Sequence, residues 1–521
     1  MPYRLNNIFN SSSPKYIFRL VCLTILILLC GCRDNTKNTP VKTIANQSPA
    51  QNYPRKPVFV GPVSDGVRSG LHWHATPETI LADYGYEEVE YFVDGTASNL
   101  GREWGFLGST TDAGPAPETT APYRVVLVVH KPIDPGRYNG IVITEWANVS
   151  AQQNLIPLWD GAHQYLMRNG YAYIDISVQK QGIDGAPTAM AFWDPVRYGT
   201  LSHPGDNYAA DIYAQIVSAL RHADPAIFGL DPLASLEPEV FLGFGNSQSC
   251  STMVPFINFV HSDYAFFDAI LMNACNPAEL DKSIVKVMWV NTGKEVIDGA
   301  EQAADEDLYV HWEISGAAHG NNDVLSYGLL NRVSHDTSSV YGMPAQPNSY
   351  DYATEYQYGE VGPGKCPASN FLPSRYVYGI AVQNTVTWAK SDLRPPSAER
   401  LVLADDLGFF VNDEDGNPIG GYRLPIIDVP VARYISDTTC TDGATLPLLP
   451  TRLAELYSSH ADYVAQLQSA TDQAVKNRFL LPEDACLLMR RAIASGIGGV
   501  DHVVENIPQC NELTFKEVSR P

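Results

Sequence analysis

The sequence predicts an α/β protein with a mostly parallel central sheet, helices on both faces, and an irregular cap and C-terminal addition. From about residue 123 to residue 316, apolar strand-like segments alternate with helical segments. This alternation is typical of parallel strands joined by crossover helices that cover both faces of a sheet. The strand-like segments are nearly continuous apolar runs, as expected for strands buried on both faces. Ligands of such sheets bind beyond the carboxyl ends of the strands.

Seven segments are predicted strands because each is rich in β-branched or aromatic residues and is bounded by turn residues. They are residues 123–132, 140–146, 171–178, 239–245, 267–273, 285–291 and 308–316. Residues 157–170 and 206–222 are predicted helices. The first ends in Asn-Gly, and Asp206 is expected to cap the second, which Pro225 follows.

After about residue 324 the regular alternation is lost. Residues 335–450 are rich in Pro, Asn, Asp and Gly, and Asp415-Gly416 predicts a hairpin. Two amphipathic helices are expected at 451–477 and 482–495, the second with Pro in its first turn. We interpret these regions as a cap and peripheral additions to one α/β domain, residues 57–521.

The first 31 residues have the features of an export signal. Three basic residues precede the apolar run 20–29, and no acid occurs before Asp34. An apolar run of ten residues is too short to cross a hydrocarbon core of about 30 Å as a helix. We therefore expect residues 1–31 to be removed as a signal peptide.

Residues 29–32, Leu-Cys-Gly-Cys, resemble the lipobox of bacterial lipoproteins, in which cleavage precedes a cysteine that receives diacylglycerol. The resemblance implies that Cys32 carries a lipid anchor. Arg33 follows it in place of Asp, which by similarity with Gram-negative lipoproteins implies the outer membrane or the periplasmic face. The alternative is an ordinary signal peptide with a chance cysteine. Residues 32–56 are expected to be a flexible tether.

The net charge limits the binding partners, and the number of cysteines predicts disulfides. Acids outnumber bases 58 to 35, giving a net charge of -23, so the field of the protein repels phosphate backbones and nucleic acid is excluded. Six cysteines lie in the exported body, and an even number in an oxidising compartment predicts disulfides whose pairing stays open. They are Cys250, Cys275, Cys366, Cys440, Cys486 and Cys510.

A serine between a predicted strand and a predicted helix is the clearest chemical signal. The segment Gly245-Asn246-Ser247-Gln248-Ser249 directly follows the strand 239–245. On such a tight turn the serine hydroxyl stands above the sheet, and small residues two positions away relieve crowding. Ser247 is therefore the candidate nucleophile, with Ser249 as the second small residue. The alternative is a plain helix N-cap.

Chain order predicts the other catalytic groups. Glu295 follows the sixth predicted strand and His319 follows the seventh, so that serine, acid and histidine occur in the order of an α/β-hydrolase triad. His319 is expected to take the proton of Ser247, and Glu295 to hold the imidazole in the right tautomer. Asp298 is the second choice of acid. A loop histidine and a surface carboxylate are the alternatives.

An oxyanion needs two backbone N–H donors. Gln248 is expected to supply one, and the loop after strand 140–146, near Asn148 and Val149, the other; a turn residue is the alternative role for Asn148. A disulfide between Cys250 and Cys275 would staple the elbow helix to the next strand end, provided that their Cα atoms lie within about 7 Å.

Other polar residues are assigned to structure. Arg197, His203 and Asp206 are expected to form a hydrogen-bond network that fixes a loop, with substrate contact as the alternative. His72 and His74 share one face of a strand, but no third ligand lies nearby in sequence, so we expect no metal. The chemistry of a serine triad requires no cofactor.

With these residues in view, the chain resembles a bacterial family of large α/β-hydrolase domain proteins with a Gly-x-Ser-Gln-Ser elbow. The resemblance runs from about residue 90 to 475 and includes the segments GIVITEWANVS, RYGTLSHPGD, GNSQS, EISGAAH and DEDGNPIGGYRLPIIDVPVARY. It implies the hydrolase fold and esterase-like chemistry.

The sequence thus predicts an exported, lipid-anchored serine hydrolase that cleaves a carboxylic ester, of a small molecule or a polymer, through an acyl-enzyme. An amidase or peptidase of the same fold is one alternative, because the same triad cleaves amides. A non-catalytic surface-binding lipoprotein is the other, because a fold does not dictate a function. The acyl group, the alcohol and the oligomeric state stay open.

Overall fold

The fold is given by a computed structural model, which describes residues 48–67, 71–104, 115–320, 370–404, 409–436, 443–498 and 510. All of these residues belong to one unit, residues 44–521. The predicted signal peptide, Cys32, residues 32–47 of the tether, Cys366 and Cys440 lie outside the described residues.

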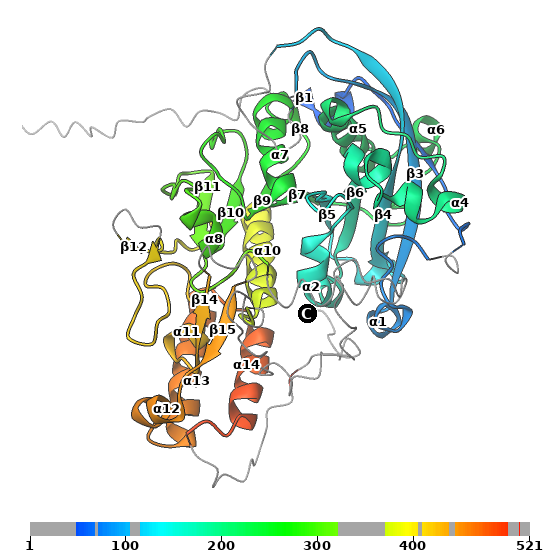
Figure 1. Cartoon of the computed structure of the whole chain (residues 1–521). Coiled ribbons are helices and arrows are strands. Elements are labelled where there is room, and N and C mark those ends of the chain that lie inside the picture. The colour runs from blue at the N-terminus through cyan, green and yellow to red at the C-terminus, as the bar shows by residue number, and fades with distance from the viewer. Residues whose placement is uncertain are drawn as a thin grey trace, which may run out of the picture. The chain divides into compact units, whose positions relative to one another are not determined.

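A nine-stranded sheet organises the described residues, in the order β11-β10-β9-β7-β5-β6-β4-β3-β2 (Figure 1). The six strands from β11 to β6 are mutually parallel, whereas β4, β3 and β2 are added in antiparallel pairs. The strands are β2 (Val58–Val60), β3 (Tyr86–Ser98), β4 (Thr120–Pro132), β5 (Ile141–Trp146), β6 (Ala172–Ser177), β7 (Val240–Asn246), β9 (Ala269–Asn273), β10 (Val287–Asn291) and β11 (Tyr309–Glu313). The seven predicted strands and the mostly parallel sheet are confirmed.

Apolar residues on both faces explain why the central strands are buried. Along β5, Val142 and Trp146 pack into the core on one face, and Ile141 and Ile143 pack into the core on the other. Every residue of β5 is buried. This is the reason that the strand reads as a continuous apolar run.

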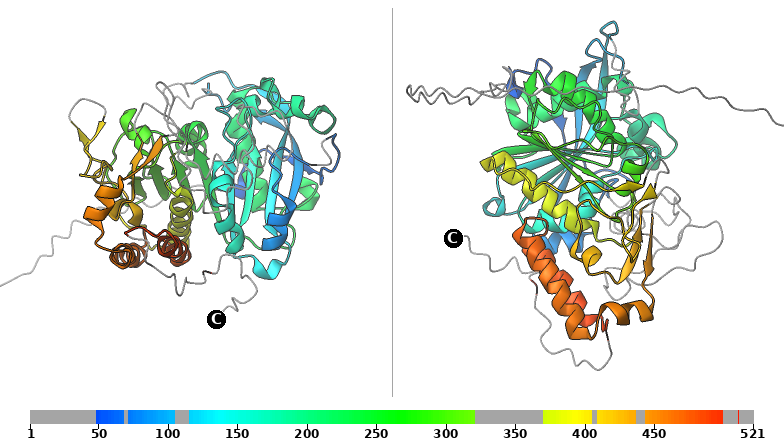
Figure 2. Two further views of the ribbon diagram at one scale, coloured as in Figure 1. Left: turned by 60° about the horizontal axis from the view of Figure 1, so that its bottom comes forward. Right: turned by 90° about the vertical axis from the view of Figure 1, so that its left-hand side faces the viewer.

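Helices cover both faces of the sheet, as Figure 2 shows in its right-hand view. On one face lie α5 (Ala209–Arg221) and α7 (Gln248–Phe256), whose buried residues belong to the same core as Val142 and Trp146. On the other face lie α2 (Pro157–Arg168) and α10 (Ser374–Ser391). Helix α10 falls in the region where no regular helix was predicted.

Short elements connect these layers. They are the helices α1 (Glu78–Tyr84), α3 (Met190–Trp193), α4 (Pro195–Tyr198), α6 (Pro225–Phe228) and α8 (Gly293–Ile297), and the strand pairs β1 (Ser48–Pro49) with β8 (Tyr264–Ala265) and β12 (Leu403–Ala404) with β13 (Phe409–Phe410). The prediction that Asp206 caps α5 is wrong: its carboxylate accepts from the Lys180 N–H at 2.7 Å, and a turn over Asp206–Tyr208 precedes the helix.

The C-terminal part adds helices and a small sheet. It contains α11 (Pro425–Asp428), β14 (Ala432–Ile435), β15 (Ala444–Pro447), α12 (Pro450–Leu456), α13 (His460–Lys476) and α14 (Pro482–Ala494). The helix predicted over 451–477 is two helices, because the Ser459 hydroxyl accepts from the Asp462 N–H at 3.1 Å and starts α13 anew. Helix α14 begins at Pro482 as predicted.

The hairpin predicted at Asp415-Gly416 is present. Asn412 and Pro418 form an antiparallel bridge, and Gly416 lies between them with a φ of 82°, a conformation that favours glycine.

In the described ranges of the chain, no helix has both the length and the apolar character needed to cross a membrane.

Candidate active site

The turn between β7 and α7 presents Ser247 with strained backbone geometry. Ser247 has φ 54° and ψ -117°, a conformation that non-glycine residues rarely adopt and that is typical of a nucleophile elbow. A Cβ on Gly245 would lie 2.7 Å from the Met253 sulfur, so glycine is required there. The Ser249 hydroxyl accepts from the Asn246 N–H at 3.0 Å and so braces the turn, in the position of the second small residue.

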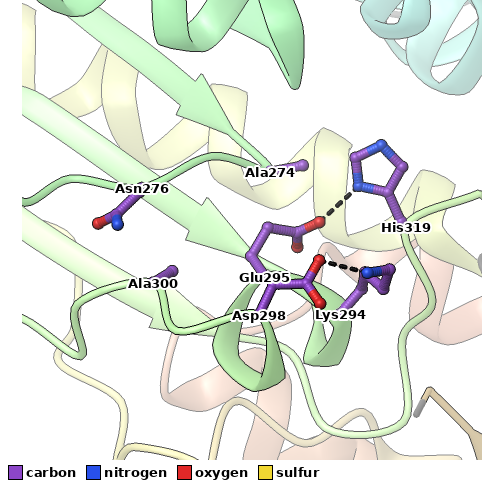
Figure 3. A pocket seen from close by; sticks show the side chains of 7 residues that line it. All are labelled: Ala274, Asn276, Lys294, Glu295, Asp298, Ala300 and His319. Carbon is purple, nitrogen blue, oxygen red and sulfur yellow. Dashed lines mark hydrogen bonds and ion pairs between the residues drawn. The ribbon is translucent and has the colours of Figure 1, made fainter. Parts of the chain in front are cut away.

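Ser247, His319 and Glu295 form a hydrogen-bonded chain. The Ser247 Oγ lies 3.1 Å from the His319 Nε2, and the His319 Nδ1 lies 2.5 Å from the Glu295 Oε1 (Figure 3 shows the second contact). The carboxylate selects the tautomer with the proton on Nδ1, which leaves Nε2 to accept the serine proton. Three loops at the carboxyl ends of β7, β10 and β11 therefore meet as the chain order predicted.

Glu295 is held in place by the residue three positions before it. The Glu295 Oε2 accepts from the Thr292 N–H at 2.8 Å and from the Thr292 hydroxyl at 2.6 Å, a capping box at the start of α8. Glu295 is buried, with 7% of its surface exposed. Asp298, the second-choice acid, pairs instead with Lys294, toward which its carboxylate points (Figure 3). Thr292 was missed from the sequence, although the Thr-x-x-Glu spacing is its signal.

The loop after β5 lies beside the elbow, but its backbone N–H groups are already bonded. The Asn148 N–H donates to the Leu155 carbonyl at 2.9 Å, and the Val149 N–H donates to the Gln248 Oε1 at 3.0 Å. At Asn148 and at Val149, the backbone N–H that was expected to be the second oxyanion donor is therefore bonded to another acceptor. Gln248 directly follows Ser247 and is the first residue of α7, so its backbone N–H belongs to the first turn of that helix.

A cavity of about 310 Å³ opens beside the acid and the histidine (Figure 3). Besides Glu295 and His319, it is lined by Ala274, Asn276, Lys294, Asp298 and Ala300. The wall is thus built from the loop after β9 and from α8, and most of its side chains are polar.

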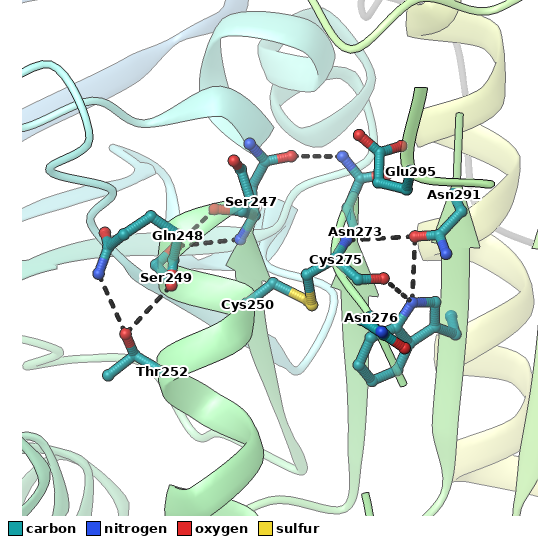
Figure 4. The surroundings of a disulfide bond; sticks show 12 residues. Ser247, Gln248, Ser249, Cys250, Thr252, Asn273, Cys275, Asn276, Asn291 and Glu295 are labelled. Atoms are coloured by element: carbon teal, nitrogen blue, oxygen red, sulfur yellow. Dashed lines mark hydrogen bonds between the residues drawn. A yellow bond between two sulfur atoms is a disulfide. The ribbon is translucent and has the colours of Figure 1, made fainter. Parts of the chain in front are cut away.

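A disulfide joins the elbow helix to this wall. Cys250, three residues after Ser247, is bonded to Cys275, and their Cα atoms are 6.0 Å apart (Figure 4). The sequence left the pairing of the cysteines open, and the structure contains the one pair that was considered there, within the required Cα separation. A second disulfide joins Cys486 of α14 to Cys510.

The fold and the site together indicate an α/β hydrolase, and a model of the α/β hydrolase domain family matches residues 59–490. The chain belongs to this family. No curated protein gave a significant match.

Solved structures similar to this α/β hydrolase include a cold-adapted esterase from an Arctic intertidal metagenomic library, at 12% identity and a TM-score of 0.23, covering 43% of this chain and 77% of that chain. Another is an α/β serine hydrolase without a lid from Xanthomonas campestris, at 12% identity and a TM-score of 0.26, covering 43% of this chain and 92% of that chain.

The remaining polar candidates of the hydrolase are structural. The buried Arg197 pairs with Glu90, the Arg197 Nε lying 2.6 Å from the Glu90 Oε2. The His203 Nε2 lies 2.8 Å from the Val178 carbonyl, and burial lowers the pKa of His203 to about 4. These contacts fix loops, as expected for a network.

The paired histidines of the sequence are also held by carboxylates. The His72 Nε2 lies 2.6 Å from the Glu88 Oε1, and the His74 Nδ1 lies 3.3 Å from the Asp175 Oδ1. Among the residues that the structure describes, no group of three or more His, Cys, Asp or Glu side chains is arranged to hold a metal ion.

Proposed function

We propose that this α/β hydrolase is a serine esterase that cleaves a carboxylic ester through an acyl-enzyme. The observation that carries the proposal is the chain of contacts from Ser247 through His319 to Glu295, at 3.1 Å and 2.5 Å. A hydroxyl, an imidazole and a carboxylate in this order are the groups that nucleophilic acyl transfer requires.

The reaction has two half-reactions. In the first, the Ser247 Oγ attacks the ester carbon while the His319 Nε2 takes its proton, and the C–O bond to the alcohol then breaks as the alcohol oxygen receives that proton. In the second, water gives a proton to Nε2 and attacks the acyl carbon, and the proton returns to Oγ as the acid leaves. Glu295 stabilises the imidazolium formed in each half.

The cavity beside His319 supports a small, polar leaving group. The alcohol must lie near Nε2 to receive its proton, and the cavity of about 310 Å³ touches His319. Its volume is at the lower end of the roughly 300–1,000 Å³ of small-molecule sites. Asn276, Lys294 and Asp298 offer both donors and acceptors to a hydroxylated group.

Substitution of the nucleophile and the base tests the proposal. With short aryl esters, Ser247→Ala and His319→Ala are expected to lower kcat/KM by about a thousandfold or more. Ser251→Ala, one turn further along α7, is the matched control and is expected to keep the activity. A fluorophosphonate should label the wild type and not Ser247→Ala, and matched ester and amide substrates distinguish an esterase from an amidase. Full activity in Ser247→Ala would exclude the triad.

We further propose that the enzyme works outside the cytosol on a lipid anchor at Cys32, in the outer membrane or at the periplasmic face. The support is the basic and apolar start of the chain and the lipobox-like residues 29–32.

A further inference from the structure

The oxyanion of the proposed reaction needs two donors, and the backbone of the neighbouring loop does not offer the second. Four consecutive N–H groups are in hydrogen bonds: Ala147 to the Ile176 carbonyl, Asn148 to the Leu155 carbonyl, Val149 to the Gln248 Oε1, and Ser150 to the Asn148 Oδ1. The second donor must therefore come from another group near the elbow.

The Asn148 side chain is held with its amide nitrogen toward the elbow. The Asn148 Oδ1 accepts from the Ser150 N–H at 2.9 Å and from the Ser150 hydroxyl at 2.7 Å, which distinguishes the oxygen from the nitrogen. The Nδ2 donates to the Asn246 carbonyl at 2.8 Å, and this carbonyl belongs to the peptide that enters Ser247. The residue is 2% exposed.

Two adjacent contacts bracket the nucleophile between them. Asn148 bonds the residue before Ser247, and Val149 bonds the side chain of Gln248, the residue after it. The loop therefore runs alongside the elbow and contacts the residues on both sides of Ser247. An amide nitrogen carries two hydrogens, and the Asn246 carbonyl uses one of them.

We propose that the Asn148 Nδ2 is the second oxyanion donor, acting with the Gln248 backbone N–H. This inference rests on the proposed esterase function. As the ester carbonyl becomes tetrahedral, its oxygen gains negative charge and accepts the second Nδ2 hydrogen, which stays on nitrogen throughout. The donor is preorganised, because the main chain of Asn148 also pairs with Leu155 in both directions, at 2.9 Å and 2.8 Å.

The test measures kcat and KM separately for two variants. Asn148→Ala removes the amide. Asn148→Asp keeps an oxygen for Ser150 and replaces the donor nitrogen with an acceptor. Both are expected to lower kcat on a short aryl ester by about a hundredfold or more, with KM nearly unchanged, which is the effect of removing one oxyanion donor.

Asn139→Ala is the matched control at the other end of β5. The Asn139 Nδ2 donates to the Asn169 carbonyl at 2.8 Å, and its Oδ1 accepts from the Ile141 N–H at 2.9 Å, so it makes the same pair of local bonds away from Ser247. This variant is expected to keep kcat.

Binding of an aryl boronic acid, which forms a tetrahedral adduct on serine, separates catalysis from folding. The Asn148 variants should lose about as much boronate affinity as kcat while still unfolding in one cooperative thermal transition, at a somewhat lower temperature because buried hydrogen bonds are lost. An Asn148→Ala enzyme with wild-type kcat and boronate affinity would overturn this proposal alone, because the wild type would still be an esterase. A wild type that neither cleaves esters nor reacts with a fluorophosphonate would instead overturn the proposed function.

Discussion

Two carboxylates three residues apart show how local geometry decides which candidate acid contacts His319. Glu295 and Asp298 both lie at α8, but the capping box with Thr292 turns the Glu295 carboxylate toward His319, whereas Asp298 is paired with Lys294. A Cβ on Gly293, the first of the two residues between cap and acid, would lie 2.3 Å from the Ser436 Oγ and 2.9 Å from the Phe410 ring, so a larger residue there would displace these side chains. Hydrogen bonds and ion pairs with neighbouring residues therefore decide which of the two carboxylates contacts His319.

Neutralising each acid in turn tests this selection. Glu295→Gln is expected to lower kcat/KM by about a hundredfold or more, because an amide does not stabilise the imidazolium. Asp298→Asn is expected to change it by less than about fivefold on a short aryl ester, since Asp298 is paired with Lys294 and such an ester has no hydroxylated leaving group for Asp298 to bind. Steady-state kinetics on one aryl ester measures both, and equal losses in the two variants would contradict the assignment of Glu295.

At the scale of single residues, sequence reasoning reached the groups that follow strand ends and missed those defined by hydrogen bonds. Ser247, Glu295 and His319 were found because each follows a parallel strand, and the carboxyl ends of parallel strands lie at the same edge of the sheet. The role inferred for the Asn148 side chain depends on where its amide points, and this is set by Ser150 and Asn246. No spacing in the sequence reveals that orientation.

At the scale of elements, the sequence reveals those strands whose side chains are mostly apolar and can be buried without oppositely charged neighbours. The seven predicted strands are mostly apolar on both faces, with single buried acids such as Glu145 of β5 and Glu313 of β11. Strand β3 was missed because Glu87, Glu88, Glu90 and Asp94 interrupt its apolar pattern. Their charges are matched by groups distant in sequence, such as Arg197 for Glu90 and Arg124 for Asp94.

Helix α10 was missed for a different reason. It is buried on most sides, between the sheet and the C-terminal helices, so it has no broad polar face to produce a helical pattern. It also contains Gly379 and several β-branched residues, which have low helix propensity. Tertiary packing therefore determines this helix.

The buried cluster around Glu88 of β3 predicts a pH dependence of stability. Glu88 lies 2.6 Å from His72 and 2.6 Å from His130 of β4. Burial by itself would raise the pKa of Glu88, but the two imidazoles lower it well below its usual range. Burial by itself would lower the pKa of His72, but Glu88, with smaller effects of Glu90 and Asp175, raises it.

The signs define a window. The contribution of Glu88 is present above its ordinary pKa of about 4.3 and is lost as pH falls toward its folded value; that of His72 is complete below about 6.5 and is lost as pH rises through its raised folded pKa. Glu88→Gln should therefore lower the melting temperature most near pH 5–6. Breaking a buried ion pair lowers the free energy of unfolding by about 3–5 kcal/mol.

Calorimetry across pH 3–9 measures this difference. Glu87→Gln is the control, because Glu87 is exposed on the same strand and lies 3.6 Å from Lys131. A Glu88→Gln difference that is constant over this range would contradict the proposed charge pairing.

At the scale of the whole molecule, the proposed anchor determines where the enzyme acts. In a Gram-negative host, the full chain is expected in the membrane fraction and in the detergent phase on partitioning, and Cys32→Ser is expected in the soluble fraction because it lacks the acceptor for diacylglycerol. Mass spectrometry of the mature N-terminus gives the cleavage site and the lipid mass. A wild type that is cleaved elsewhere and carries no lipid would contradict the anchor.

The Cys250–Cys275 bond makes the packing around the candidate site depend on the redox state of the compartment that holds the chain. Thiols stay reduced in most bacterial cytosols, whereas the periplasm oxidises them. A molecule retained before secretion would have its nucleophile helix and cavity wall held together only by packing. With the proposed export, this disulfide forms only after the chain has left the cytoplasm, and a preparation made in a reducing cytoplasm would lack the covalent link between the elbow helix and the cavity wall.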